Sequence, residues 1–217
     1  MTVSAIMNDR NPKAEEQANS EIARDLANVG VTAGSPWDLV GSGGDKPWST
    51  EAAQVLANHL TKPHPQFVLQ GIILAGCWLE TRNLFFDTVV RILRENGCSI
   101  LGQVAANGLL RMAKKDDAEI MRSLIMDKSV GESRGLLIEG YGRFAKQGAI
   151  PTLRANIHDP DVRSEVLKAL SKLGDQSIRG ELLELCKHPD SFHRKIARDA
   201  LARLDNKATK SKPKKTN

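Results

Sequence analysis

Small and apolar side chains recur along this chain at a nearly constant interval. A small residue, an apolar residue and, three positions after that, another apolar residue form a pattern that begins at Ala75, Gly108, Gly140, Ala169 and Ala200. The intervals are 33, 32, 29 and 31 residues, and the flanking apolar positions have helical spacing. A period of about 30 residues indicates stacked helix pairs, because one pair cannot bury its own apolar face and packs against its neighbours.

The spacing predicts an N-terminal helix and then five helix pairs joined by short turns. The predicted helices cover residues 13–29, 50–60, 66–79, 82–96, 99–113, 116–126, 130–145, 148–157, 160–173, 176–187 and 190–204. This gives a helix with a loop rich in glycine and proline over 1–48, a repeat array over 49–204 and a lysine-rich tail over 205–217. The predicted fold class is all-α, an α-α solenoid with an N-terminal helical cap.

Within the second helix of each pair, one face is expected to be buried. The residues seven positions before the last apolar residue of the pattern are Ile72, Ala105, Leu137, Val166 and Ala197. They share a helix face with the repeated pattern, whose small residues let neighbouring helices approach closely. The opposite face becomes polar toward the C-terminus, where it carries Glu139, Lys168 and Asp199.

One repeat resembles a known family. The segment Asp159-Pro160-Asp161-Val162-Arg163, followed by Ala169-Leu170-x-x-Leu173-Gly174-Asp175, resembles a HEAT repeat, close to the variant of phycobilisome-lyase-type proteins. The resemblance covers about residues 49–204 and is strongest over 159–175. It implies a right-handed superhelix whose second helices line the concave side, an Asp/Arg ladder between repeats that includes Arg134, Arg163 and Arg194, and a role in binding proteins or nucleic acid.

Charge is unevenly placed along the chain. The net charge is +5, but residues 141–217 hold 17 Lys and Arg against 9 Asp and Glu, whereas residues 1–140 hold 14 against 17. The tail 205–217 has five Lys, one Asp and no apolar side chain beyond one Ala, so we expect it to be disordered.

Cations also recur one position before the last apolar residue of the pattern. With two lysines nearby they form a candidate binding edge for DNA, RNA or an acidic protein surface, consisting of Arg111, Arg143, Lys168, Lys172, Lys195 and Arg203. The repeated cations also stand in the last turns of their helices, where positive charge is favoured in any case.

No catalytic set, metal site or cofactor site is predicted. Cys77, Cys98 and Cys186 form no close pair, and Cys186, His188 and His193 lack a fourth ligand at zinc spacing. The glycine-rich segment 41–47 lacks the spacing of a phosphate-binding loop. Alkylpurine DNA glycosylases resemble this chain in length and helix pairing, but Glu139 and Asp199 have no aromatic residue beside them, and we expect no enzyme.

The longest mainly apolar run, residues 67–79, is 13 residues, shorter than the roughly 20 that span a bilayer. The first residues show no signal-peptide pattern, so a cytoplasmic protein that does not enter membranes is expected. The predicted function is a non-enzymatic HEAT-repeat scaffold that binds a macromolecular partner, with a protein favoured. The alternatives are a toxin-neutralising immunity protein, a nucleic-acid-binding protein and a protein that handles a prosthetic group.

Overall fold

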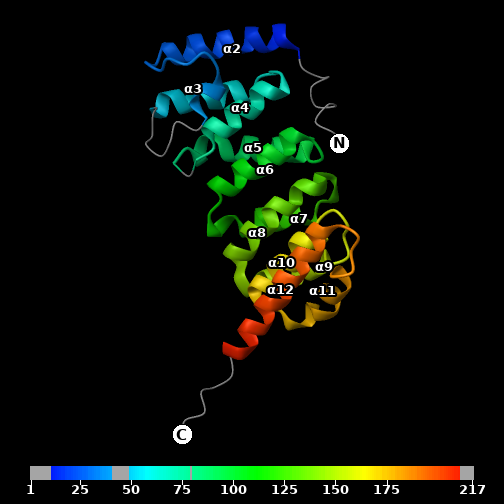
Figure 1. Ribbon diagram of the computed structural model, residues 1–217. Coiled ribbons are helices and arrows are strands. Elements are labelled where there is room, and N and C mark those ends of the chain that lie inside the picture. Colours follow the sequence, from blue (N-terminus) through cyan, green and yellow to red (C-terminus); the bar gives the residue numbers. More distant parts are fainter. Residues whose placement is uncertain (1–10, 41–48, 79, 211–217) are drawn as a thin grey trace. The chain divides into compact units, whose positions relative to one another are not determined.

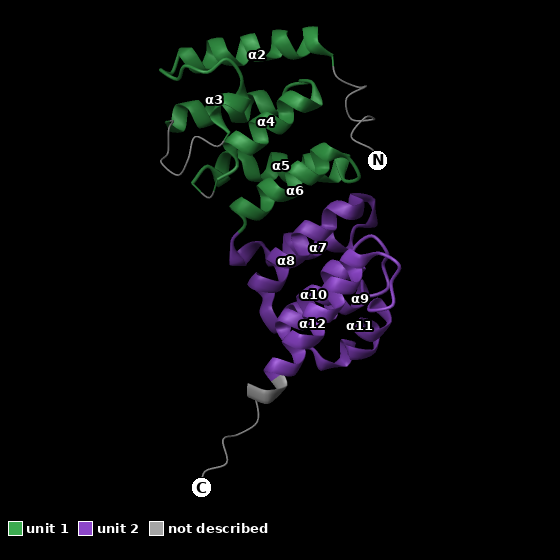
Figure 2. Cartoon of the chain, viewed as in Figure 1, with its two compact units in different colours: residues 1–113 green, residues 114–217 purple. Residues whose placement is uncertain are grey.

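A computed structural model describes residues 11–40, 49–78 and 80–210, with side chains described as far as residue 207. All regular structure among these residues is helical, which confirms the all-α class. The chain divides into two compact units, Met1–Ala113 and Lys114–Asn217 (Figure 2). The pattern of helix pairs is present in both units, and each is described separately below.

Unit 1 begins with the predicted N-terminal helix. Its elements are α2 (Pro12–Ala27), the short 3-10 helix η1 (Pro36–Leu39), α3 (Thr50–Leu60), α4 (Gln66–Gly76), α5 (Arg82–Asn96) and α6 (Ile100–Met112). Helix α2 packs on α3 and α3 on α4, while α6 packs against both α5 and α4. Helix α2 therefore covers the first pair, and the two pairs meet mainly through their second helices, α4 and α6 (Figure 1).

Unit 2 repeats the arrangement three times. Its elements are η2 (Lys115–Asp117), α7 (Ala118–Met126), η3 (Lys128–Ser133), α8 (Arg134–Ala145), η4 (Lys146–Ala149), α9 (Ile150–Ala155), α10 (Arg163–Leu173), η5 (Gln176–Ile178), α11 (Arg179–Leu185) and α12 (Ser191–Lys210). The second helices α8, α10 and α12 pack in succession, each beside the first helix of its own pair (Figure 1). This is the packing of a helical repeat protein.

The face predicted to be buried is buried in every repeat. Ile72, Ala105, Leu137, Val166 and Ala197 all have 0% exposure. The small residues of the pattern permit close approach: a methyl group added at Gly108 of α6 would lie 2.8 Å from the Cγ2 atom of Ile73 on α4. The apolar pattern therefore identified these core positions, although Phe144, Leu173 and Leu201 of the pattern are only half-buried.

Helix α4 ends three residues before its predicted end. The Thr81 hydroxyl donates to the Gly76 carbonyl oxygen at 2.5 Å and accepts from the Trp78 backbone N–H at 3.1 Å. The Thr81 hydroxyl thus takes the place of the backbone partners that another helical turn would supply to these two groups. The helix therefore stops at Gly76. Leu79, the last residue of the pattern in this repeat, lies outside the described residues.

Helix α12 continues through Lys210, so the predicted tail is helical over residues 205–210. Asp205 forms an ion pair with Arg179, with 2.6 Å between Oδ1 and Nη1. The Lys207 ammonium donates to the carbonyl oxygen of Lys172. These polar contacts to earlier elements hold a segment that has no apolar contribution to make. Residues 211–217 of the predicted tail lie outside the described residues.

Part of the loop after α2 packs against helix α4. Trp37 of η1 stacks on Phe67 with ring centroids 4.7 Å apart, and its Nε1–H donates to the Phe67 carbonyl oxygen at 3.1 Å. The glycine-rich segment 41–47 lies outside the described residues. No helix in the described part of the chain is both long enough and apolar enough to cross a membrane.

Candidate functional site

A groove with a volume of 270 Å³ lies in unit 2 between α8 and α10. Its lining includes small residues from both helices, namely Gly135, Gly142 and Ala169. The nearest atom that a methyl group added at Gly142 would meet is Ala169 Cβ, at 3.9 Å, so the two helix faces leave space between them. The charged lining residues are Glu139, Arg143, Lys146, Glu165, Lys168 and Lys172.

Glu139 joins the two lysines of α10 to α8. Its Oε1 atom lies 2.6 Å from Lys172 Nζ, and its Oε2 atom lies 3.7 Å from Lys168 Nζ. The hydrogen bond from Lys172 lowers the pKa of Glu139, so this carboxylate is ionised at neutral pH. All three side chains are about half exposed, and such pairs are weak enough to exchange partners.

Arg143 and Lys146 carry the groove's other positive charges. Among the described residues, neither forms an ion pair, and Arg143 lies over the Phe144 ring at 5.5 Å from its centroid. Lys146 follows the last residue of α8 with φ of 49°, a backbone conformation that side-chain-bearing residues rarely adopt. Strained residues of this kind cluster at binding sites, where the surrounding structure holds them in place.

The structure brings together only part of the predicted binding edge. Arg143, Lys168 and Lys172 line the groove. Arg203 donates to the Ser171 hydroxyl at 3.1 Å, and Lys195 is exposed on α12 without lining the groove.

Arg111 belongs to unit 1 and has a different role. Its guanidinium donates to the Leu74 carbonyl oxygen at 3.1 Å and lies 3.7 Å from the centroid of the Trp78 ring. Burial lowers its pKa. Arg111 thus connects α6 to the end of α4, and its place in the binding edge stays a prediction.

Two groove residues were missed from the sequence. Lys146 lies just beyond the last apolar residue of its repeat, and Glu165 lies off the repeated columns, so the alignment of repeats assigned neither to the edge. The sequence did contain one signal for Lys146, which is a positive charge directly after the predicted end of the helix 130–145.

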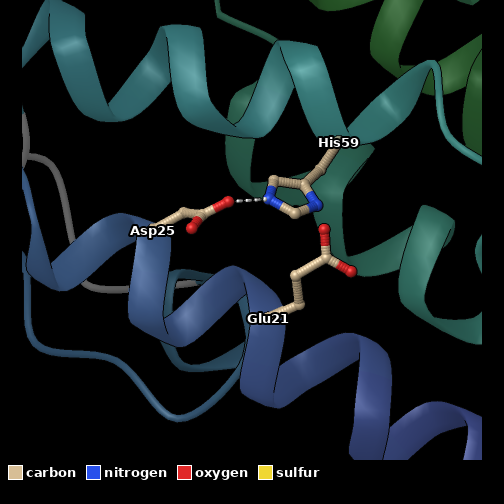
Figure 3. A group of neighbouring side chains, drawn as sticks. All are labelled: Glu21, Asp25 and His59. Atoms are coloured by element: carbon tan, nitrogen blue, oxygen red, sulfur yellow. Dashed lines mark hydrogen bonds and ion pairs between the residues drawn. The ribbon is translucent and has the colours of Figure 1, made fainter.

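A second polar group, also missed, lies in unit 1. Glu21 and Asp25 of α2 and His59 of α3 place one oxygen or nitrogen donor each within 4.8 Å of one another (Figure 3). The four-residue spacing of the carboxylates was visible in the sequence, since it puts both on one helix face. Their meeting with His59 depends on tertiary packing. These are the residues among those described that could hold a metal ion.

The histidines that were considered from sequence lie elsewhere and have local partners. His188 Nδ1 accepts from the Asp190 backbone N–H at 3.1 Å, and His193 Nδ1 lies 2.5 Å from the Ser164 hydroxyl.

Comparison with known proteins agrees with the repeat geometry. Residues 150–213 match the family model of HEAT repeats, a segment that contains α9 to α12 and one side of the groove. No curated protein and no solved structure matches the chain. The match includes the segment from Asp159 to Asp175 that carries the resemblance, so this part of the chain is similar to HEAT repeats.

Proposed function

We propose that this protein is a non-enzymatic HEAT-repeat binding protein whose groove between α8 and α10 takes an acidic segment of a protein partner. The observation that carries the proposal is that one groove combines small lining residues with two cations, Arg143 and Lys146. Neither cation forms an ion pair among the described residues. An arginine can bind a carboxylate through two parallel hydrogen bonds, and a nearby lysine adds charge. HEAT repeats typically mediate protein interactions, which supports the same reading.

The charge pattern favours a protein over nucleic acid. A phosphate backbone is bound by a continuous positive surface, whereas Glu139 and Glu165 lie in this groove among the cations. Glu139 already pairs with both Lys168 and Lys172. An acidic protein segment can place single carboxylates at Arg143 and Lys146 and leave the Glu139 pairs intact, while a continuous polyanion would also lie against the carboxylates. Neutralisation of a toxin would use the same groove, with the toxin as the partner.

The experiment is an affinity capture from the native host with three forms of the full chain. The groove variant carries Arg143→Glu and Lys146→Glu, and the control carries Lys195→Glu and Arg198→Glu, an equal charge change on exposed residues of α12. We expect a protein captured by the wild type and the control to be reduced at least tenfold with the groove variant. Equal capture by all three forms would reject the groove as the binding surface.

Binding to nucleic acid is the second candidate, because residues 141–217 carry an excess of positive charge. Fluorescence anisotropy with a labelled duplex and a labelled single strand at two salt concentrations tests it. The variant Arg143→Glu, Lys172→Glu, Arg203→Glu serves as the comparison. Tight binding that falls steeply with salt and is lost in this variant would replace the acidic protein segment with a polyanion.

A further inference from the structure

The polar group between α2 and α3 is built around a buried imidazole. His59 is 1% exposed, and its Nε2 atom lies 2.9 Å from Asp25 Oδ2. Glu21 stands one turn earlier on α2 and completes a set of three donor atoms within 4.8 Å of one another. Figure 3 shows both carboxylates directed from α2 toward the ring on α3.

The orientation of His59 is held from its other side. Its Nδ1 atom lies 2.9 Å from His64 Nε2, and the two rings stack with centroids 5.1 Å apart. A metal-binding histidine is usually oriented in this way by a hydrogen bond from the ring nitrogen that does not bind the metal. When His59 Nε2 lacks a proton, Nδ1–H donates to His64 Nε2, and His64 then carries its proton on Nδ1.

Each carboxylate of the group is paired with one positively charged side chain, and a divalent ion can replace both of these cations. Lys62 Nζ lies 2.6 Å from Glu21 Oε1, and Arg24 Nε lies 3.6 Å from Asp25 Oδ1. The Lys62 side chain is 41% exposed and that of Arg24 is 71% exposed, so both can turn into water at little cost.

We propose that Glu21, Asp25 and His59 bind a zinc-class divalent ion, with one oxygen from each carboxylate and Nε2 of His59 as the protein ligands and water in the remaining position. Donors at zinc distances of about 2.0–2.2 Å lie about 3.3 Å apart around a tetrahedral ion. The Asp25 and His59 atoms, now at 2.9 Å, need to separate by about 0.4 Å, and the Glu21 oxygen, which lies within 4.8 Å of both, needs to move inward for one ion to bind all three. An imidazole with two carboxylates suits zinc, whereas calcium and magnesium prefer oxygen donors throughout.

The consequence of binding is a link between two helices. Glu21 and Asp25 belong to α2 and His59 belongs to α3, so the ion links α2 to the first helix pair of unit 1. Because the ion binds only the folded arrangement, it raises stability by mass action. The site lies in unit 1 and is independent of the groove in unit 2.

The test is a calorimetric titration of the metal-free full chain with Zn²⁺, followed by thermal unfolding with and without the ion. Glu21→Gln removes one ligand from a side chain that is 37% exposed, so the fold is retained; Asp25→Asn removes another. Glu16→Gln is the control, an equal charge change on an exposed residue of the same helix. Ca²⁺ is the control ion.

We expect the wild type and Glu16→Gln to bind one Zn²⁺ at this site and to gain several degrees in melting temperature. Glu21→Gln and Asp25→Asn should each bind at least tenfold more weakly and gain little, and Ca²⁺ should have no comparable effect. Zinc isotherms and melting shifts that are the same in Glu21→Gln as in the wild type would overturn the proposal. An absence of zinc binding by the wild type would do so as well.

Discussion

Arg134 shows at the level of single residues how neighbouring repeats are joined. Its side chain is 0% exposed and its Nη1 atom lies 2.9 Å from Asp159 Oδ2, a residue of the next repeat. Nε donates to the Gly131 carbonyl oxygen at 2.9 Å, and Asp161 lies 3.2 Å from Nη2. The resemblance to HEAT repeats implied such a ladder. The structure pairs Asp159 with Arg134 of the preceding repeat, because this pairing depends on how the repeats stack.

The pair makes stability depend on pH. The hydrogen bond from Arg134 lowers the pKa of Asp159 from its usual 3.8, so the charged form stabilises the fold above about pH 4, and this contribution is lost as pH falls through the lowered value. We expect Asp159→Asn to cost about 2–3 kcal/mol at pH 7, less than a fully orphaned buried charge because Arg134 keeps its other partners.

Chemical denaturation of wild type and Asp159→Asn at pH 7 and near pH 2.5 measures this difference, which should shrink at the lower pH. Asp161→Asn is the matched control, since that side chain is 47% exposed and should cost less than about 1 kcal/mol. A difference for Asp159→Asn that does not change with pH would contradict the assignment.

The buried face of the second helices can be tested at Leu170 of α10, which is 0% exposed. Leu170→Ala should lower the free energy of unfolding by about 2–4 kcal/mol, because it leaves a cavity among packed helices. Lys172→Ala, on the exposed side of the same helix, should cost less than about 1 kcal/mol. Urea denaturation of both variants decides the matter, and similar losses would mean that the helix faces are assigned wrongly.

At the level of elements, apolar periodicity was enough to place nearly every helix. The predicted ranges 50–60 and 82–96 coincide with α3 and α5, because their ends fall where the apolar pattern stops. The ends of α4 and α12 differ, since polar contacts determine them: Thr81 closes one, and Asp205 with Lys207 prolongs the other. Such contacts join residues far apart in sequence and leave no periodic signal.

The groove depends on glycine in α8, and this gives a steric test of its role. A methyl group at Gly142 would meet only Ala169 Cβ, at 3.9 Å, so Gly142→Leu adds a side chain to the groove without a backbone clash. We expect the variant to keep its melting temperature within a few degrees and to lose at least tenfold in partner capture. Gly148→Leu, where an added methyl group meets nothing within 4 Å, is the control. Unchanged capture by Gly142→Leu would argue against the groove.

The last described side chains of α12 lie on the surface. Leu204 is buried, while residues 205–207 are exposed. A chain that ends after Asp205 keeps the ion pair to Arg179 and should melt within a few degrees of the full chain. Circular dichroism checks this, and a collapse of helicity would show that residues beyond Asp205 are needed for the fold.

At the level of the whole molecule, the fold class followed from the sequence and the site only in part. The repeat period predicted the stacked pairs of both units, and the charge count predicted a basic C-terminal half. The alignment could not show that Glu139 would pair with Lys168 and Lys172, that Arg111 would stack on Trp78, or that Lys146 would reach the groove. Each depends on which side chains meet across helices, and a column of like charges in an alignment does not reveal its partners.

The proposed function depends on one interaction, the binding of a protein partner in the groove between α8 and α10. It can be measured by site-specific photocrosslinking in the native host, with a photoreactive phenylalanine analogue at position 165, which lines the groove, and, as control, at position 187 on the surface outside it. We expect a crosslinked protein at position 165 that is absent at position 187 and is lost when Gly142→Leu is added. Crosslinks of equal yield at both positions, or none at position 165, would show that the partner does not bind in the groove.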